Sequence, residues 1–158
     1  RRFGKRFYSY ILGSGDASIE ASIDSMHHHM VGYFNARFEY NETLSHRLYA
    51  AADFLLMPSR VEPCGLNQLY AMRYGTVPIV RRTGGLQDTV VDIEDWQGYG
   101  ICFQHATVDE VVRAIGRAIS LYDDTKKLAI ARHNMMKINN SWERRTGEYI
   151  DLYHSIVK

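Results

Sequence analysis

Glu62 and Gly65 place a carboxylate beside a flexible backbone position, in a short stretch between two apolar segments. The run Phe54–Met57 before them is typical of a buried strand, and Leu66–Tyr74 after them is apolar at helical spacing. The stretch 62–65 is therefore expected to turn from a strand end into a helix start, where ligands bind in open α/β sheets. Gly65 lets a backbone approach a ligand closely, and the unpaired N–H groups of a helix start suit a phosphate. A carboxylate would repel that phosphate, so a sugar hydroxyl is the natural partner of Glu62.

Two further loops are expected beside this turn. Arg81–Leu86 follows the strand-like segment Thr76–Val80 and carries two arginines and two glycines that are free to take positive φ. Taken alone, it is interpreted either as an anion site or as an ordinary turn with surface arginines, and the presence of the Glu62 loop favours the anion site. The loop Glu39–Glu42 adds an aromatic ring. If these loops meet Ser59–Gly65 at the carboxyl edge of one sheet, they offer what is needed to hold a base, a sugar and a diphosphate. This combination predicts a nucleotide-sugar site, though it is not unique to one.

Strand-like and helix-like segments alternate along the chain, which is typical of an α/β protein. Strands are expected at Phe7–Leu12, Met30–Arg37, Asp53–Met57, Thr76–Val80 and Ile101–Phe103. Helices are expected from a Ser18 cap to about His28, from a Thr43 cap onward, over Leu66–Tyr74, from Thr107 onward, over Asp124–Ile138 and over Trp142–Val157. Asp92–Gly100 is polar and is expected to be a surface loop. The pattern predicts a Rossmann-like parallel sheet with helices on both faces, in a single domain over residues 1–158.

The composition fits one globular domain and argues against several classes of partner. The 158 residues suffice for a hydrophobic core, and 46% of them are hydrophobic. A net charge of +1 gives no case for binding nucleic acid or an anionic membrane. The two cysteines form no Cys-x-x-Cys pair, which favours a reduced, cytoplasmic setting. No signal peptide or membrane-spanning run is expected.

Other candidate sites are weaker. His27, His28 and His29 are adjacent, but neighbouring residues on a helix point in different directions, so a solvated helix end is preferred to a metal site. Cys64 is conceivable as a nucleophile, but no partner base is evident, and a role in shaping the loop is preferred. The acidic and histidine residues show no metal-ligand spacing. Chemistry without a metal or cofactor is therefore expected.

Three long motifs resemble those of bacterial glycogen synthases and plant starch synthases. They are Ser59-Arg-Val-Glu-Pro-Cys-Gly-Leu66, Tyr70-Ala-Met-Arg-Tyr-Gly-Thr-Val-Pro78 and Arg82-Thr-Gly-Gly-Leu-Gln-Asp-Thr89, within a likeness that runs from about Ile11 to the C-terminus. The resemblance implies a retaining glucosyltransferase with two Rossmann-like domains, the GT-B type. It implies transfer of glucose from ADP-glucose, or UDP-glucose in some members, to the non-reducing end of an α-1,4-glucan.

The same resemblance implies that this chain is most of the C-terminal, donor-binding domain, without its first strand–helix unit. The acceptor site and the family's basic groups for the donor phosphates are then expected outside this chain, and the chain alone is expected to be inactive. The last helix, in 142–158, is expected to pack on the other domain, so that part of its apolar stripe is exposed here. The simpler alternative for that stripe is packing in the core of this domain.

The resemblance also assigns roles to single residues. Glu62 matches a glutamate that contacts the donor sugar and helps to stabilise positive charge near the anomeric carbon, and Tyr40 matches a tyrosine that stacks on the base. The other matched positions follow the donor with their backbone: Cys64, Gly65 and Leu66 along the sugar and phosphates, and Thr83, Gly84 and Gly85 at the distal phosphate. Tyr70 stands where related retaining enzymes carry a second glutamate that holds the ribose.

Two alternatives remain beside a glycogen or starch synthase. Another GT-B glycosyltransferase or a sugar-nucleotide epimerase would be expected to keep a glutamate at position 70, so Tyr70 counts against it. A non-catalytic nucleotide- or glucan-binding domain is the other alternative. The residues leave the choice between ADP-glucose and UDP-glucose open.

Overall fold

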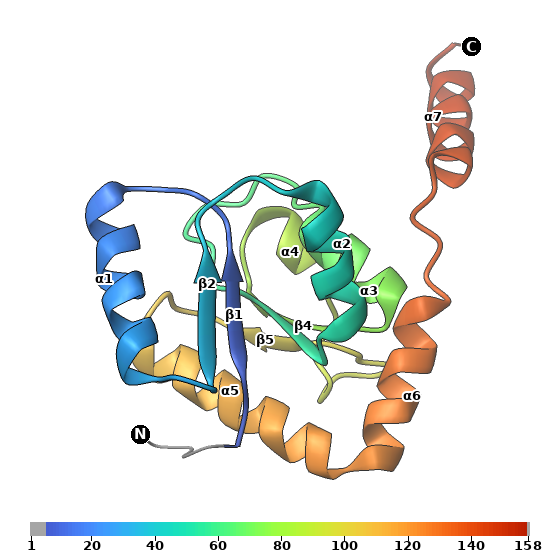
Figure 1. The fold of residues 1–158 in the computed structure, drawn as a ribbon. Coiled ribbons are helices and arrows are strands. Elements are labelled where there is room, and N and C mark those ends of the chain that lie inside the picture. Colours follow the sequence, from blue (N-terminus) through green and yellow to red (C-terminus); the bar gives the residue numbers. More distant parts are fainter. Residues whose placement is uncertain (1–5, 158) are drawn as a thin grey trace.

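Parallel strands alternate with helices over residues 6–157, the part of the chain that the computed structural model describes (Figure 1). Strands β1 (Ser9–Leu12) and β2 (Phe34–Arg37) form one parallel pair. Strands β3 (Phe54–Met57), β4 (Val77–Arg81) and β5 (Ile101–Phe103) form a second parallel sheet with β4 in the centre. The α/β prediction with parallel strands and flanking helices is confirmed, and the strands are divided between two sheets.

Apart from α4, which begins within the segment 81–86 that was expected to be a turn, the helices follow the predicted order. They are α1 (Ala17–His29), α2 (Glu42–Ala51), α3 (Asn67–Tyr74), α4 (Gly84–Thr89), α5 (Val108–Asp123), α6 (Thr125–Met136) and α7 (Trp142–Ile156). Helix α1 packs on β2, α3 and α4 pack on β4, and α5 packs on β4 and β5. Helix α6 lies against α3 and α5. The central strand β4 is thereby covered by helices. Of these, α3 begins directly after the loop that contains Glu62, and α4 begins at Gly84.

Two predicted helix caps are wrong by two residues. Asp16, not Ser18, caps α1, because its carboxylate accepts hydrogen bonds from the N–H groups of Ser18 and Ile19. Asn41, not Thr43, caps α2 by accepting from the N–H of Leu44 at 2.9 Å. In both cases an acidic or amide side chain two residues upstream takes the capping position, and Asp and Asn rank among the best capping residues.

Two loops also differ from the prediction. The strand expected from Met30 begins only at Phe34, because Gly32 takes φ +82° and the chain turns before it extends. The segment 92–100 is only partly a surface loop, since Asp92 and Tyr99 are buried within it. The backbone of Asp92 also bridges to that of Gly100.

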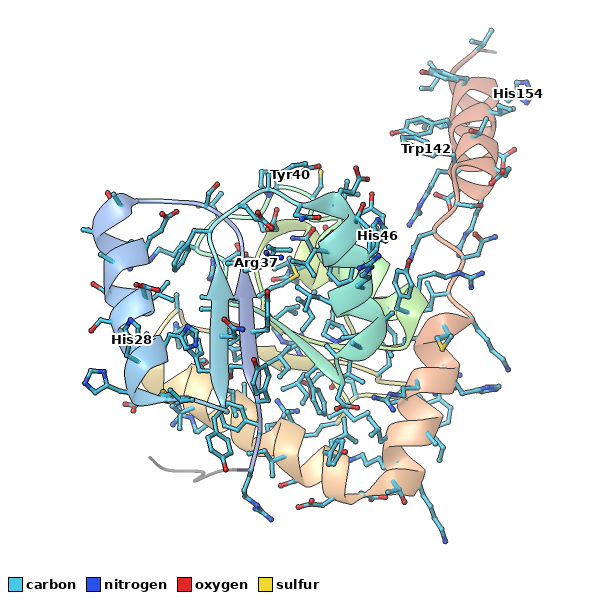
Figure 2. All side chains as sticks on the ribbon, viewed as in Figure 1. His28, Arg37, Tyr40, His46, Trp142 and His154 are labelled. Carbon is cyan, nitrogen blue, oxygen red and sulfur yellow. The ribbon has the colours of Figure 1, made fainter. Side chains whose placement is uncertain are left out.

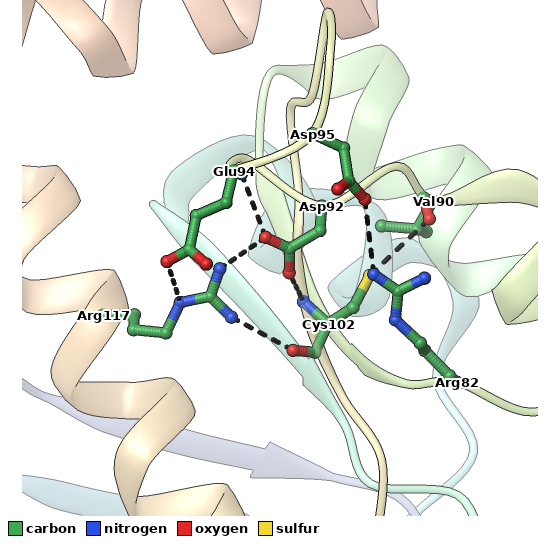
Figure 3. Close-up of polar contacts among 7 residues, drawn as sticks. All are labelled: Arg82, Val90, Asp92, Glu94, Asp95, Cys102 and Arg117. Atoms are coloured by element: carbon green, nitrogen blue, oxygen red, sulfur yellow. Dashed lines mark hydrogen bonds and ion pairs between the residues drawn. The ribbon is translucent and has the colours of Figure 1, made fainter.

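Asp92 joins this loop to β5 and α5 through buried polar contacts (Figure 3). Its carboxylate accepts from Cys102 N–H at 2.6 Å, from Arg117 Nη2 at 2.5 Å and from Glu94 N–H at 3.0 Å. Burial alone would raise the pKa of Asp92, but these hydrogen bonds and the Arg117 charge outweigh it and hold the pKa below its usual value. The ionised carboxylate thus holds the middle of β5.

The hydrophobic core surrounds β4. Val77, Ile79 and Val80 are buried, and they pack with apolar side chains of the adjacent helices and of β5, including Met72, Leu86, Ile101, Ala114, Ala118, Leu128 and Ala131. Fully burying one such aliphatic side chain is worth about 1.5–3 kcal/mol. This packing fixes β4, and the register that pairs Met57 with Val80 fixes the end of β3 beside it. Both strands therefore deliver their following loops to the same edge.

Helix α7 extends away from the body of the domain (Figure 1). Its apolar side chains are exposed, with Trp142 80% and Ile156 69% accessible, and none of its residues is buried. The alternative that this stripe packs in the core of the domain is therefore wrong. Within residues 6–157, no helix has the length and apolar character needed to cross a bilayer.

Candidate functional site

Glu62 lies in an irregular loop between the end of β3 and the start of α3, as the sequence predicts. The side chain is half-buried, and the Ser59 hydroxyl donates to Glu62 Oε2 at 3.3 Å. Gly65 takes φ +73°, a backbone conformation that other residues rarely adopt. The loop thus carries one carboxylate whose orientation is supported from three residues upstream.

The buried side chain of Gln68 holds the end of this loop through hydrogen bonds, a role that was not predicted from the sequence. Its side chain is fully buried, and Nε2 lies within hydrogen-bond distance of Cys64 O (3.3 Å), Gly65 O (3.0 Å) and Thr89 Oγ1 (3.1 Å). A Cβ at position 65 would lie 2.6 Å from Gln68 Oε1, so the amide also requires glycine there. A signal for this burial was present, because Gln68 precedes the buried Ala71 and Met72 by one helical turn.

The Thr83–Gly85 segment lies directly against the Glu62 loop. Gly85 N–H lies 3.2 Å from both Glu62 O and Pro63 O. A Cβ at Gly84 would overlap the Glu62 carbonyl oxygen, and one at Gly85 would overlap that of Cys64. Helix α4 begins at Gly84, and of the two glycines only Gly84 takes positive φ, at +43°. The paired glycines therefore allow two loops to touch through their backbones.

The two arginines at this edge both have partners within the chain. The Arg81 guanidinium donates to Ser59 O at 2.7 Å and to Arg60 O at 2.5 Å. Arg82 Nη2 lies 3.4 Å from the Asp95 carboxylate (Figure 3). Of the two interpretations of this turn, the contacts of Arg81 fit the structural one, because its donors point at loop carbonyls.

Tyr40 lies beyond the carboxyl end of β2, on the rim of the molecule (Figure 2). Its ring is 88% exposed, so one face is free to stack on a planar ligand. Among residues 6–157, no hydrogen bond or ring contact is recorded between Tyr40 and either the Glu62 loop or the Thr83–Gly85 segment. The structure therefore joins two of the three predicted loops by direct backbone contact, and no hydrogen bond within residues 6–157 ties Tyr40 to them.

Tyr70 belongs to an aromatic cluster between α2 and α3. Its ring centroid lies 5.6 Å from that of His46 and 6.2 Å from that of Tyr49. Tyr74 completes the cluster, with its hydroxyl 3.1 Å from His46 Nδ1. Tyr70 thus helps to pack α3, the helix that follows the Glu62 loop, against α2.

The two cysteines lie in opposite environments. Cys64 is exposed on the Glu62 loop, whereas Cys102 is buried in β5. Burial, with the neighbouring Asp92 charge, raises the pKa of the Cys102 thiol to about 11.

Leu66, the last of the matched loop residues, is exposed at the start of α3. Over residues 6–157, no three histidine, cysteine or acidic side chains come together as a metal site.

Comparison with known proteins agrees with this geometry. The family profile "Glycosyl transferases group 1" matches residues 25–135. The chain is 51% identical to a glycogen synthase of Flavobacterium johnsoniae, over 94% of this chain and 31% of that protein. It is 48% identical to a glycogen synthase of Rhodospirillum rubrum, over 93% of this chain and 30% of that protein. The chain thus spans about a third of the length of these relatives.

A solved structure is also similar over most of the chain. It is the catalytic domain of starch synthase IV from Arabidopsis thaliana, bound to ADP and acarbose, with a TM-score of 0.80 and 35% identity. The match covers 92% of this chain and 31% of that one. With the parallel α/β fold and the loops at the strand ends, these matches lead to one conclusion: the chain belongs to the group 1 glycosyl transferases.

Proposed function

We propose that this chain forms the donor-binding half of a glycogen or starch synthase. The enzyme transfers glucose with retention from ADP-glucose or UDP-glucose to the non-reducing end of an α-1,4-glucan. The observation that carries the proposal is the contact of Gly85 N–H with the carbonyls of Glu62 and Pro63, which makes one rigid unit of two motifs. The glycogen synthase relatives and the ADP-bound starch synthase support the choice of reaction.

Glu62 acts on the donor sugar in this proposal. Positive charge develops at the anomeric carbon when its bond to the diphosphate breaks, and a nearby carboxylate stabilises that charge. Ser59 keeps the carboxylate oriented by donating to Oε2. Because this hydrogen bond exists before a substrate arrives, little reorganisation is needed during the reaction.

The leaving diphosphate meets the start of α3 and the Thr83–Gly84 backbone. Leu66, the N-cap residue that precedes α3, makes no side-chain hydrogen bond to the helix, so no capping side chain stands between the first N–H groups of α3 and a ligand. The N–H of Gly85 is directed at the Glu62 loop, so Thr83 and Gly84 make the distal phosphate contacts. Tyr40 stacks on the base with its exposed ring.

The remaining partners follow from the same assignment. The glucan acceptor binds mainly to parts of the enzyme outside this chain. The reaction needs no metal or cofactor, and it takes place in the cytoplasm without a nucleic acid or membrane partner. Helix α7 packs through its exposed apolar stripe on the other domain.

The Glu62→Gln variant of the complete protein that contains this chain tests the proposal. Glucose transfer to glycogen is measured with ADP-glucose and with UDP-glucose, and ADP affinity is measured by calorimetry. Turnover is expected to fall about 100-fold while ADP affinity stays within about threefold, because the amide keeps the shape but loses the charge. Glu20→Gln, on the distant helix α1, is the matched control and should leave turnover unchanged.

Two outcomes contradict parts of this assignment, and a third selects between the two donors. Normal turnover by Glu62→Gln would remove the assigned role of that residue. ADP binding without any glucose transfer by the unmodified protein would favour a non-catalytic nucleotide-binding domain. Binding of UDP but not ADP would exclude ADP-glucose as the donor.

A further inference from the structure

Arg81 sits where the last residue of β4 meets the chain leaving β3. The β3–β4 ladder ends with the pair Met57 and Val80, so the carbonyls beyond Met57 have no strand partner there. Arg81 supplies one, because its Nε donates to Ser59 O at 2.7 Å and its Nη2 donates to Arg60 O at 2.5 Å. The remaining nitrogen, Nη1, lies 3.5 Å from Gln104 O after β5.

These contacts fix the beginning of the loop that carries Glu62. Three sets of hydrogen bonds hold that loop. Arg81 donates to the carbonyls of Ser59 and Arg60, Gly85 N–H donates to those of Glu62 and Pro63, and Gln68 donates at the end of the loop. Only the first lies before Glu62 in the chain. Its acceptor Ser59 is also the residue whose hydroxyl donates to the Glu62 carboxylate. A displacement of Ser59 therefore moves the group that orients Glu62.

We propose that Arg81 is a positioning residue for Glu62, which acts by holding Ser59 and Arg60 through their carbonyl oxygens. The inference rests on the proposed function, in which Glu62 serves the donor sugar. The planar guanidinium binds two successive carbonyls at once, whereas a lysine ammonium would satisfy them with less defined geometry. In this role Arg81 does not contact the substrate, and its charge does not neutralise the diphosphate.

The alternative chemistry for an arginine at this edge is a direct contact with the donor phosphates. The geometry argues against it, since both Nε and Nη2 of Arg81 are already committed to carbonyl oxygens. The two roles differ in kinetics. Loss of a phosphate contact weakens donor and ADP binding, whereas displacement of Glu62 lowers turnover with little change in binding.

The test uses Arg81→Met and Arg81→Lys in the complete protein, with Arg113→Met on the exposed face of α5 as the matched control. The kcat, the KM for the nucleotide sugar, the ADP affinity and the thermal midpoint are measured. Arg81→Met is expected to lower kcat about 10- to 100-fold, with KM and ADP affinity within about threefold, since small displacements of a reacting group cost this much. Arg81→Lys should recover part of the loss.

A double-mutant cycle with Glu62→Gln separates positioning from general destabilisation. In the Glu62→Gln background, Arg81→Met should change kcat less than about threefold, because the group it positions has already lost its charge. Additive losses would overturn the proposal, as would a raised KM with normal kcat. If Arg81→Met does not fold, Arg81→Lys decides, and normal kcat in that variant overturns the proposal. If Glu62→Gln itself retains turnover, the role that the proposed function assigns to Glu62 fails; if Glu62→Gln is inactive while both Arg81 variants are normal, only this inference fails.

Discussion

The α-carbon of Gly85 faces Cys64 so closely that a Cβ at position 85 would lie 2.6 Å from the Cys64 α-carbon. Its neighbours are backbone atoms, which cannot give way as a flexible side chain would. The Gly85→Ala variant is therefore expected to push the Glu62 loop off α4 and break the hydrogen bonds from Gly85 N–H. Turnover of the complete protein should fall at least about 10-fold, and the variant should lose about 1–3 kcal/mol of stability.

Gly147→Ala is the matched control for this substitution. Gly147 lies inside α7, and a Cβ there would meet no atom within 4 Å. Alanine in a helix interior is favoured over glycine by about 1 kcal/mol, so this variant should be as stable as the parent or more so. Chemical denaturation and glucose-transfer assays measure both variants. Equal behaviour of the two would mean that close contact at Gly85 is unimportant.

The contact between Gly85 and Cys64 also marks the limit of what the sequence predicts. The strand-to-helix turn at Glu62 was predictable, because the apolar periods on either side fix the elements and Gly75 ends the helix with φ +85°. The contact of Gly85 with the Cys64 carbonyl was not predictable, because it depends on the offset between strands β3 and β4. The same holds for Arg81, whose carbonyl partners lie 22 and 21 residues away in the sequence.

Removal of the Tyr40 ring is expected to weaken nucleotide binding without affecting stability. The ring is 88% exposed, so Tyr40→Ala creates no cavity. Loss of a stacking partner for a base should cost about 1–3 kcal/mol of ADP affinity. Calorimetry with ADP measures this in the complete protein, and Tyr122→Ala, at an exposed position of α5, is the control. Unchanged ADP affinity in Tyr40→Ala would separate this loop from the nucleotide site.

The two cysteines should differ sharply in reactivity toward an alkylating reagent. Cys102 is buried and its pKa is raised to about 11, so it stays a protonated thiol at neutral pH. Cys64 is exposed on the Glu62 loop. Mass spectrometry after mild iodoacetamide treatment at pH 7.5 should find the label on Cys64, and ADP should slow it. Labelling of Cys102 in the native protein at a comparable rate would contradict the burial of β5.

The Asp92 contacts predict a loss of stability at acid pH. The folded pKa of Asp92 lies below the ordinary value, so its stabilisation is complete above about pH 4 and is lost as the pH falls through the folded pKa. Asp92→Asn should cost about 2 kcal/mol at pH 7, because Arg117 loses a charged acceptor. Denaturant unfolding from pH 7 to pH 3 should show the two proteins converging as the pH drops. A constant difference across that range would mean that the carboxylate charge contributes nothing.

Helix α7 offers a test of the proposed contact with a second domain. Most of its apolar side chains lie on one side, at Trp142, Tyr149, Leu152, Tyr153 and Ile156, and the described part of the chain buries none of them. Leu152→Asp should therefore destabilise the complete protein by about 1–3 kcal/mol and lower turnover, since it places a charge in an apolar interface. His154→Asp adds the same group two residues away, off this stripe, and should have little effect. Thermal unfolding and kcat measure both variants. Equal effects of the two substitutions would show that the apolar stripe of α7 has no apolar partner. Packing on a second domain would then not account for the exposure of this stripe.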